Sequence, residues 1–121
     1  PVISTLAGNK LVEIFRQTLG FEVVFEADWY WHLSLPEHEN INIAFVQSDH
    51  ESVPVAFHQP VQGLLLNFEM NDVSAFYAQH QQTEWNVVLP LRDEEWGQRH
   101  FYCRRSCTGT ALRLYRGHRA H

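Results

Sequence analysis

The stretch Leu91-Arg92-Asp93-Glu94-Glu95-Trp96-Gly97-Gln98-Arg99-His100-Phe101 lies late in a chain of 121 residues and is its most informative segment. Its charges and its glycine indicate a turn that leads into a strand. A helix start at Asn71-Asp72-Val73 precedes the stretch, and a turn at Thr108-Gly109-Thr110 follows it. This order of helix, turn and strands predicts half of an α+β domain.

The first half of the chain has the same pattern. Leu11, Ile14, Phe15 and Leu19 recur at helical spacing, and Gly20 follows them as a typical helix end. Runs of β-forming residues predict strands around this helix, over 2–5, 21–25, 29–35 and 41–46.

In the second half, strands are predicted over 63–70, 87–91, 99–103 and 111–115. Asn71 or Asp72 begins a helix with one apolar stripe, formed by Val73, Phe76, Tyr77 and His80. The chain therefore consists of two βαβββ modules, which form curved mixed sheets with helices on the outer face. We expect a single domain over 1–121, with a first module over about 1–47, a linker over about 48–62 and a second module over about 63–121.

Composition restricts the class of protein. Hydrophobic residues make up 45% of the chain, as in soluble globular proteins. No apolar run approaches the roughly 20 residues of a membrane span, and no secretion-signal pattern is visible. We therefore expect a cytoplasmic protein without a membrane partner. The two cysteines, Cys103 and Cys107, are expected to be reduced structural thiols.

Charge is distributed unevenly along the chain. Residues 1–96 hold 14 acidic and 3 basic residues, a net charge of −11, whereas residues 97–121 hold six arginines and no acid. The basic segment is short and the acidic body repels phosphate, so we expect no nucleic-acid partner. A shifted reading frame near Cys103 would also produce this change, and Arg113 would then not be an evolved site residue. Translating the gene in all three frames tests that hypothesis.

Several segments carry a family resemblance. They are Phe15-Arg16-Gln17-Thr18-Leu19-Gly20-Phe21-Glu22-Val23, Asp28-Trp29-Tyr30, Asp49-His50-Glu51-Ser52-Val53-Pro54 and the stretch quoted first. In order and spacing they resemble a small, uncharacterised subgroup of the glyoxalase, bleomycin-resistance and extradiol-dioxygenase superfamily, which has the vicinal-oxygen-chelate fold. The resemblance covers nearly the whole chain. It implies two βαβββ modules side by side and a homodimer.

The resemblance also bears on metal binding. Enzymes of this superfamily bind a divalent metal through His, Glu or Gln on the first and last strands of each module. The resemblance puts Leu65 where they carry His and Arg113 where they carry Glu, and the strands over 2–5 and 41–46 offer no ligand pair. Leucine has no lone pair and arginine repels a cation, so we expect no metal and no other cofactor.

A metal-free relative is expected to bind rather than to catalyse. The resemblance favours a protein of the bleomycin-resistance type, which sequesters a planar or cationic drug or metabolite in an aromatic groove. We expect Trp29, Trp31 and Trp96 to contact the ligand, because indole faces stack on planar rings and attract cations. For Trp29 and Trp31, which should share one face of a strand, core or dimer-interface packing is the alternative.

Four further residues complete the predicted ligand site, and none of them is predicted to be catalytic. Asn67 and Glu69 should share a sheet face with Leu65 and supply a hydrogen bond and a counter-charge, although Glu69 could instead pair structurally with Arg113. His100 should lie on the strand beside Arg113, and a structural role is the alternative for a lone histidine.

Two other hypotheses remain open. The chain could be a metal-dependent lyase or dioxygenase that uses His50, His100 or Glu69, or it could be a degenerate member of the superfamily without activity. Metal content separates the enzyme from the binding protein.

Overall fold

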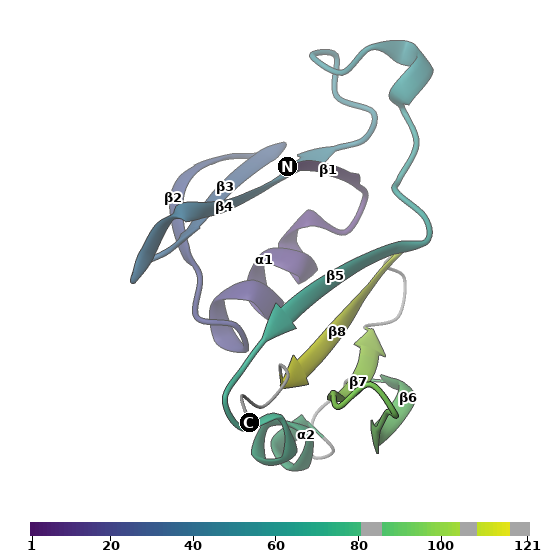
Figure 1. The fold of residues 1–121 in the computed structure, drawn as a ribbon. Helices are drawn as coiled ribbons and strands as arrows, with labels where there is room; N and C mark the ends of the chain where they lie inside the picture. Colours follow the sequence, from purple (N-terminus) through teal and green to yellow (C-terminus); the bar gives the residue numbers. More distant parts are fainter. Residues whose placement is uncertain (81–85, 105–108, 117–121) are drawn as a thin grey trace. The chain divides into compact units, whose positions relative to one another are not determined.

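A computed structural model describes residues 1–80, 86–104 and 109–116 (Figure 1). The chain divides into two compact units, Pro1–Val61 and Gln62–His121, called here unit 1 and unit 2. Each unit contains one four-stranded mixed sheet and one longer helix, in the order βαβββ. The predicted α+β fold is therefore confirmed. The expectation for Cys107 falls outside the described residues.

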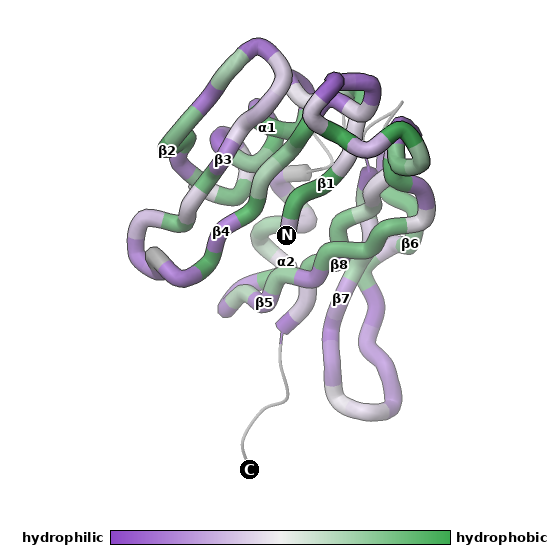
Figure 2. The backbone as a smooth tube through the Cα atoms, turned by 90° about the horizontal axis from the view of Figure 1, so that it is seen from above, coloured by the Kyte–Doolittle hydropathy of each residue, from purple (hydrophilic) through white to green (hydrophobic). Residues whose placement is uncertain are grey.

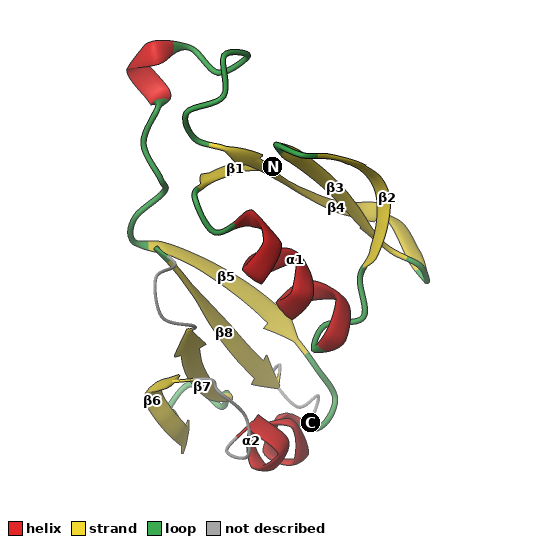
Figure 3. Ribbon diagram, turned by 180° about the vertical axis from the view of Figure 1, so that it is seen from behind, coloured by secondary structure: helices red, strands yellow, loops and turns green. Residues whose placement is uncertain are grey.

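Unit 1 has its strands in the order β1-β4-β3-β2. Its elements are β1 (Val2–Thr5), α1 (Gly8–Gln17), β2 (Glu22–Ala27), β3 (Tyr30–Leu35) and β4 (His38–Gln47). β1 runs parallel to β4, and the other neighbours are antiparallel. Helix α1 lies against one face of this sheet, as Figures 1 and 3 show.

The core of unit 1 lies between α1 and the sheet. Phe15 is fully buried, and its ring packs edge-on against Phe21 and Phe45 with centroid separations of 5.4 and 5.2 Å. Trp31 packs on α1 at Gly8, where an added Cβ would lie only 2.2 Å from the indole ring. The glycine therefore makes room for the tryptophan, and Trp31 belongs to the core.

The segment expected as a linker is tied to unit 1. Ser4 Oγ donates to the Gln59 carbonyl (2.8 Å), and Val61 N donates to the Ser4 carbonyl (2.8 Å). Between these contacts and β4 the segment contains a short 3-10 helix, η1 (Val55–Phe57). A segment bonded to β1 in this way can build part of a site in unit 1.

Unit 2 repeats the arrangement, with its strands in the order β5-β8-β7-β6. Its elements are β5 (Leu64–Glu69), α2 (Val73–His80), β6 (Asn86–Asp93), β7 (Arg99–Arg104) and β8 (Thr110–Arg116). β5 runs parallel to β8, and the remaining pairs are antiparallel. Both β7 and β8 contact α2.

The core of unit 2 lies beneath α2. Asp72 begins the helix, because its Oδ1 accepts a hydrogen bond from Ala75 N (3.0 Å). The fully buried Phe101 packs edge-on against Tyr77 of α2, with the ring centroids 4.9 Å apart. Cys103 is fully buried beside it, and burial raises the pKa of its thiol to about 12. This thiol therefore has a structural rather than a reactive environment.

A tight turn joins β6 to β7, and Figure 2 shows hydrophilic residues on both sides of a paler tip. Glu94 N donates to the Gln98 carbonyl (2.9 Å), and Gly97 N donates to the Glu94 carbonyl (3.0 Å). Gly97 has a φ of 93°, which only glycine adopts readily. The turn expected from the sequence is therefore present. In the described part of the chain, no helix is both long enough and apolar enough to cross a membrane.

Candidate functional site

The face of the second sheet that points away from α2 is called here the open face of unit 2. On β5 the side chains of Leu65, Asn67 and Glu69 are exposed on this face, and those between them are half-buried. The register places Asn67 beside Arg113. It also places Glu69, Tyr115 and His100 in one row across three strands. The sequence therefore predicted correctly that residues 65, 67 and 69 share a face.

Arg113 is held in place by neutral groups. Its Nε donates to His100 Nδ1 (3.0 Å), and its Nη2 donates to Gln98 Oε1 (2.7 Å). Its guanidinium carbon lies 4.7 Å from the centre of the Tyr115 ring, which is a cation–π contact. Three contacts thus fix the side chain, although none of them neutralises its charge.

His100 is buried on this open face, with 4% of its surface exposed, because neighbouring side chains cover it. Since Nδ1 accepts the hydrogen bond from Arg113, the ring proton of neutral His100 lies on Nε2. That atom has no hydrogen-bond partner among the described residues, and Glu94 Oε2 is 3.8 Å away. Burial, and then the charge of Arg113, lower the pKa of His100, so the ring is neutral at pH 7. With its Nδ1 lone pair engaged, the ring does not act as a general base in this arrangement.

Trp96 lies at the tip of the β6–β7 hairpin with 54% of its surface exposed. Its Nε1 donates to Gln98 Oε1 (2.9 Å), the same oxygen that accepts from Arg113. Glu94, in the same turn, pairs with Arg92 at 2.6 Å. Gln98 therefore positions an indole and a guanidinium side by side, and the carboxylate of Glu94 in the same turn already pairs with Arg92.

The structure brings Trp96, His100 and Arg113 of the predicted site into one cluster, with Asn67 on the neighbouring strand. The ion pair expected between Glu69 and Arg113 is not formed in the described part of the chain, because Arg113 leans over Tyr115 toward His100 and Gln98 instead. The alternative of a Glu69–Arg113 pairing was therefore wrong.

Trp29 and Trp31 belong to unit 1 and differ from each other. Trp31 is 7% exposed and lies in the core beneath α1, which is the packing role that the sequence left open. Trp29 precedes β3 in a turn, and its indole stacks on the His50 ring with a centroid separation of 3.7 Å and an angle of 4°. The predicted common face for the two tryptophans does not form, because the strand begins only at Tyr30.

Trp29 lines an apolar groove in unit 1, on the face of the sheet opposite α1. The groove has a volume of about 480 Å³, within the range of small-molecule sites. Side chains of β1, the β3 turn, β4 and the segment after β4 line it: Val2, Ser4, Trp29, Tyr30, Val46, Ser52, Val53, Pro54 and Phe57. Phe57 is 69% exposed. The aromatic rings that line the groove can therefore stack on a planar ligand.

Tyr30, Phe57 and Gln98 were not predicted as site residues from the sequence. A signal existed for Phe57, because it stands in an apolar run, Val53-Pro54-Val55-Ala56-Phe57, that a solvated linker does not need. Gln98 gave no such signal, since its role depends on one side-chain oxygen that accepts from both Trp96 and Arg113.

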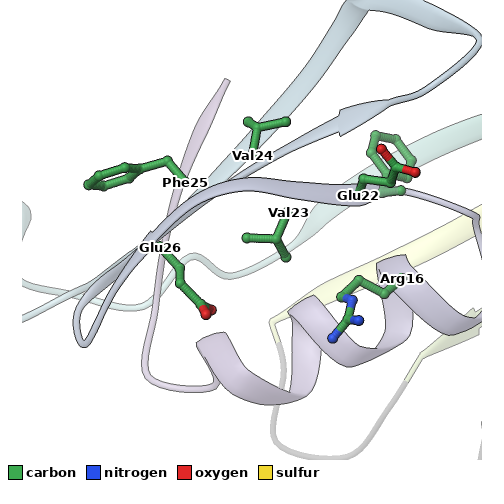
Figure 4. Close-up of a pocket in the computed structure, with 7 residues that line it drawn as sticks. Arg16, Glu22, Val23, Val24, Phe25 and Glu26 are labelled. Carbon is green, nitrogen blue, oxygen red and sulfur yellow. The ribbon is translucent and has the colours of Figure 1, made fainter.

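A second hollow in unit 1, of about 700 Å³, follows the edge strand β2 (Figure 4). Val23 points from β2 toward α1, which carries Arg16, whereas Val24 and Phe25 lie on the side away from the helix. A register shift between Val23 and Phe25 places these two consecutive apolar residues outside, where they are 55% and 57% exposed. This hollow is open to solvent, and its charged lining residues are Arg16, Glu22 and Glu26.

The residues that the sequence resemblance places at metal-ligand positions do not fit a metal. Leu65 on β5 is exposed and has no donor atom, and Arg113 on β8 carries a fixed positive charge. In unit 1, where β1 pairs with β4, the open-face residues are Val2, Ser4, Ala44 and Val46. Within the described ranges, no group of three or more His, Cys, Asp or Glu residues is arranged to hold a metal ion.

No protein-family model and no curated protein matches the sequence. Solved structures do match it. A glyoxalase/bleomycin resistance protein/dioxygenase family enzyme from Burkholderia phytofirmans PsJN superposes with a TM-score of 0.78 at 14% identity, over 96% of this chain and 94% of that chain. A glyoxalase/bleomycin resistance protein/dioxygenase from Nocardioides gives a TM-score of 0.75 at 15% identity, over 100% and 83%. TioX from Micromonospora sp. ML1 gives a TM-score of 0.73 at 13% identity, over 96% and 94%. The chain therefore has the fold of the glyoxalase/bleomycin resistance protein/dioxygenase superfamily, as the resemblance in its sequence predicted.

Proposed function

We propose that this protein binds a planar, cationic small molecule without a metal and sequesters it in the groove of unit 1. The observation that carries the proposal is the groove itself, about 480 Å³ in volume and walled by Trp29, Tyr30 and Phe57. This volume lies within the range of small-molecule sites. Aromatic walls hold planar rings by stacking, and they hold cations by their negative ring faces.

The charge of unit 1 supports a cationic guest. Residues 1–61 contain two basic residues, Lys10 and Arg16, and eight acidic residues, a net charge of −6. None of the residues that line the groove is charged, so no fixed cation in the lining repels the guest. The acidic unit raises the local concentration of cations, and the aromatic lining provides the contacts once the cation is bound.

The stacking of Trp29 on His50 gives the groove a fixed wall. His50 Nδ1 lies 2.8 Å from Ser52 Oγ and accepts from Ser52 N (3.1 Å), which holds the imidazole under the indole. A preformed wall loses less conformational entropy on binding than a mobile one.

Calorimetric titration with proflavine, a planar cation, tests the proposal. Replacing Trp29 with Leu should weaken binding about tenfold, since one cation–π contact contributes up to roughly 2 kcal/mol. The matched control is Trp96→Leu, which removes an exposed tryptophan from unit 2 and should leave the affinity for proflavine unchanged. Equal affinities for the wild type and Trp29→Leu would contradict the proposal. Tighter binding of Zn²⁺, Mn²⁺, Fe²⁺ or Ni²⁺ than of proflavine would instead favour the metal-dependent lyase or dioxygenase.

We also propose that the protein is a homodimer. Support comes from β2, which ends the sheet of unit 1 and exposes Val24 and Phe25 next to each other. Edge strands that remain unpaired are normally protected by charge, and two exposed apolar residues suit burial by another chain. Sedimentation equilibrium of the wild type should give a dimer, and Phe25→Lys should shift it toward the monomer. A monomeric wild type would contradict this part of the proposal.

A further inference from the structure

Arginines of unit 2 differ in how their charges are balanced. Arg92 pairs with Glu94 (2.6 Å), and Arg99 makes two hydrogen bonds to the carboxylate of Asp93 (2.7 and 3.0 Å). Arg113 pairs with no carboxylate in the described part of the chain, and its two acceptors, His100 Nδ1 and Gln98 Oε1, are neutral. A half-buried guanidinium without a counter-charge is costly to maintain for structure alone.

The geometry around Arg113 is fixed in advance. Nε and Nη2 are engaged with His100 and Gln98, whereas Nη1 has no partner among the described residues. A guanidinium with a free N–H edge matches the oxygens of a carboxylate or a phosphate. Because the side chain is already held by three contacts, an anion that binds there does not need to order it.

A second polar group at the site also lacks a partner. His100 is more than nine-tenths buried, and its Nε2–H has no acceptor in the described part of the chain. Its closest carboxylate, Glu94, is 3.8 Å away and already bound to Arg92. A buried donor without an acceptor costs free energy, and a bound oxygen or a bridging water would satisfy it.

The exposed indole of Trp96 lies next to the guanidinium of Arg113. Gln98 Oε1 accepts from both Trp96 Nε1 (2.9 Å) and Arg113 Nη2 (2.7 Å), so one amide oxygen sets the distance between indole and guanidinium. The turn that carries Trp96 is closed by two backbone hydrogen bonds between Glu94 and the residues Gly97 and Gln98. The indole is 54% exposed and can stack on a ring.

Glu69 is an acidic residue on the same open face of unit 2. It pairs in register with Tyr115, whereas Arg113 leans over Tyr115 toward the β6–β7 turn. The net charge of unit 2 is +1, from seven basic and six acidic residues, in contrast to −6 in unit 1. An anion is therefore not repelled from unit 2 as it is from unit 1.

We propose that the open face of unit 2 is a binding site for an aromatic ring that carries an oxyanion, with the oxyanion on Arg113 and the ring on Trp96. This site goes beyond the proposed function, because it lies in the other unit and takes a ligand of opposite charge. It does not depend on the groove.

Calorimetric titration with naphthoate, naphthyl phosphate and the neutral naphthamide tests the proposal. The wild type should bind at least one of the two anions about tenfold more tightly than naphthamide, the factor expected for one charge-assisted contact. The comparison between naphthoate and naphthyl phosphate then tells which oxyanion fits. Equal affinities for all three probes would overturn the proposal, and this comparison needs no variant.

Variants locate the site. Arg113→Met removes the charge but keeps much of the length of the side chain, and it should weaken binding of the preferred anion about tenfold. Arg16→Met removes the same charge from unit 1 and should have no effect. Trp96→Leu should weaken binding of the preferred anion, and Val55→Ala, at an exposed position of unit 1, should not. If Arg113→Met and Arg16→Met bind the anion equally well, the proposal is wrong. If Arg113→Met does not fold, Trp96→Leu and the comparison of probes on the wild type decide.

Discussion

Units 1 and 2 have the same βαβββ order and the same strand arrangement, but their open faces differ. Unit 1 has a net charge of −6 and an uncharged groove walled by Trp29, Tyr30 and Phe57. Unit 2 has a net charge of +1 and an arginine fixed beside Trp96. In both units the core residues point toward the helix, and the face away from it carries the difference. The pattern of buried core residues therefore determines this fold, whereas the open faces and the connecting segments determine what each unit can bind.

If the two cores are equivalent, truncating the central aromatic ring of either core should lower the free energy of unfolding by a similar and large amount. Phe45 and Phe101 are both fully buried, so Phe45→Ala and Phe101→Ala should each lower the free energy of unfolding by about 3–5 kcal/mol. Chemical denaturation measures both. Val55→Ala, at a position that is 81% exposed, is the control with an expected change near zero. A small loss at one of the two phenylalanines would show that the cores are not equivalent.

Within unit 1, Trp31 belongs to the core rather than to the open face. Gly8→Ala should lower the free energy of unfolding by roughly 1–3 kcal/mol, because the new Cβ would meet the indole at 2.2 Å. Alanine is otherwise the better helix former, so the sign of the effect is informative. In a Trp31→Leu background the same substitution should cost much less, which a double-mutant cycle measures. If Gly8→Ala lowers the free energy of unfolding equally in that background, the added Cβ clashes with a group other than Trp31.

The charge of Arg113 should be visible at His100. Burial lowers the pKa of His100 most, and Arg113 adds to the effect. In an NMR titration, Arg113→Met should therefore raise the pKa of His100 partway toward its ordinary value, whereas Arg16→Met should not. An unchanged His100 titration in Arg113→Met would contradict the contact between the two side chains.

The lowered pKa of His100 also predicts how the stability of the fold changes with pH. The folded-state pKa of His100 lies below its ordinary value of 6.5, so its contribution to stability is complete above pH 6.5. That contribution is lost as the pH falls through the folded pKa. His100→Gln should flatten this part of the stability profile, measured by denaturation at a series of pH values.

The smallest expected effect concerns the exposed pair between Asp93 and Arg99. The hydrogen bond from Arg99 lowers the pKa of Asp93 from 3.8, so the pair stabilises the fold above pH 3.8, and the effect disappears as the pH falls through the folded pKa. Asp93→Asn should therefore differ from the wild type at neutral pH and approach it in acid. A constant difference across the acid range would assign the effect to packing rather than to charge.

Most of the fold could be predicted from the sequence, because it depends on local periodicity. The apolar spacing of Leu11, Ile14 and Phe15 indicated α1, and these residues are buried in it. Alternation indicated β8, in which Leu112 and Leu114 are buried and Arg113 is not. The arginine-rich end of the chain thus still supplies a strand with the alternation that this sheet position requires.

The site could be predicted only in part, because it depends on side-chain contacts between distant residues. The predicted strand order was sufficient to put His100 on the strand beside that of Arg113. It could not show that Arg113 turns away from Glu69, since that direction is set by the acceptors His100 and Gln98. It also could not show that Trp31 fits against Gly8, a contact between a strand and a helix.

The two open faces are expected to bind ligands of opposite charge, and two-dimensional proton–nitrogen NMR of the tryptophan indole N–H groups tests this difference most directly. The four indole signals can be assigned with single Trp→Phe variants. On addition of proflavine the signal of Trp29 should shift and that of Trp96 should not. On addition of naphthoate or naphthyl phosphate the signal of Trp96 should shift and that of Trp29 should not. A single indole that responds to both cation and anion, or no response at either residue, would contradict the presence of two sites with opposite charge preference.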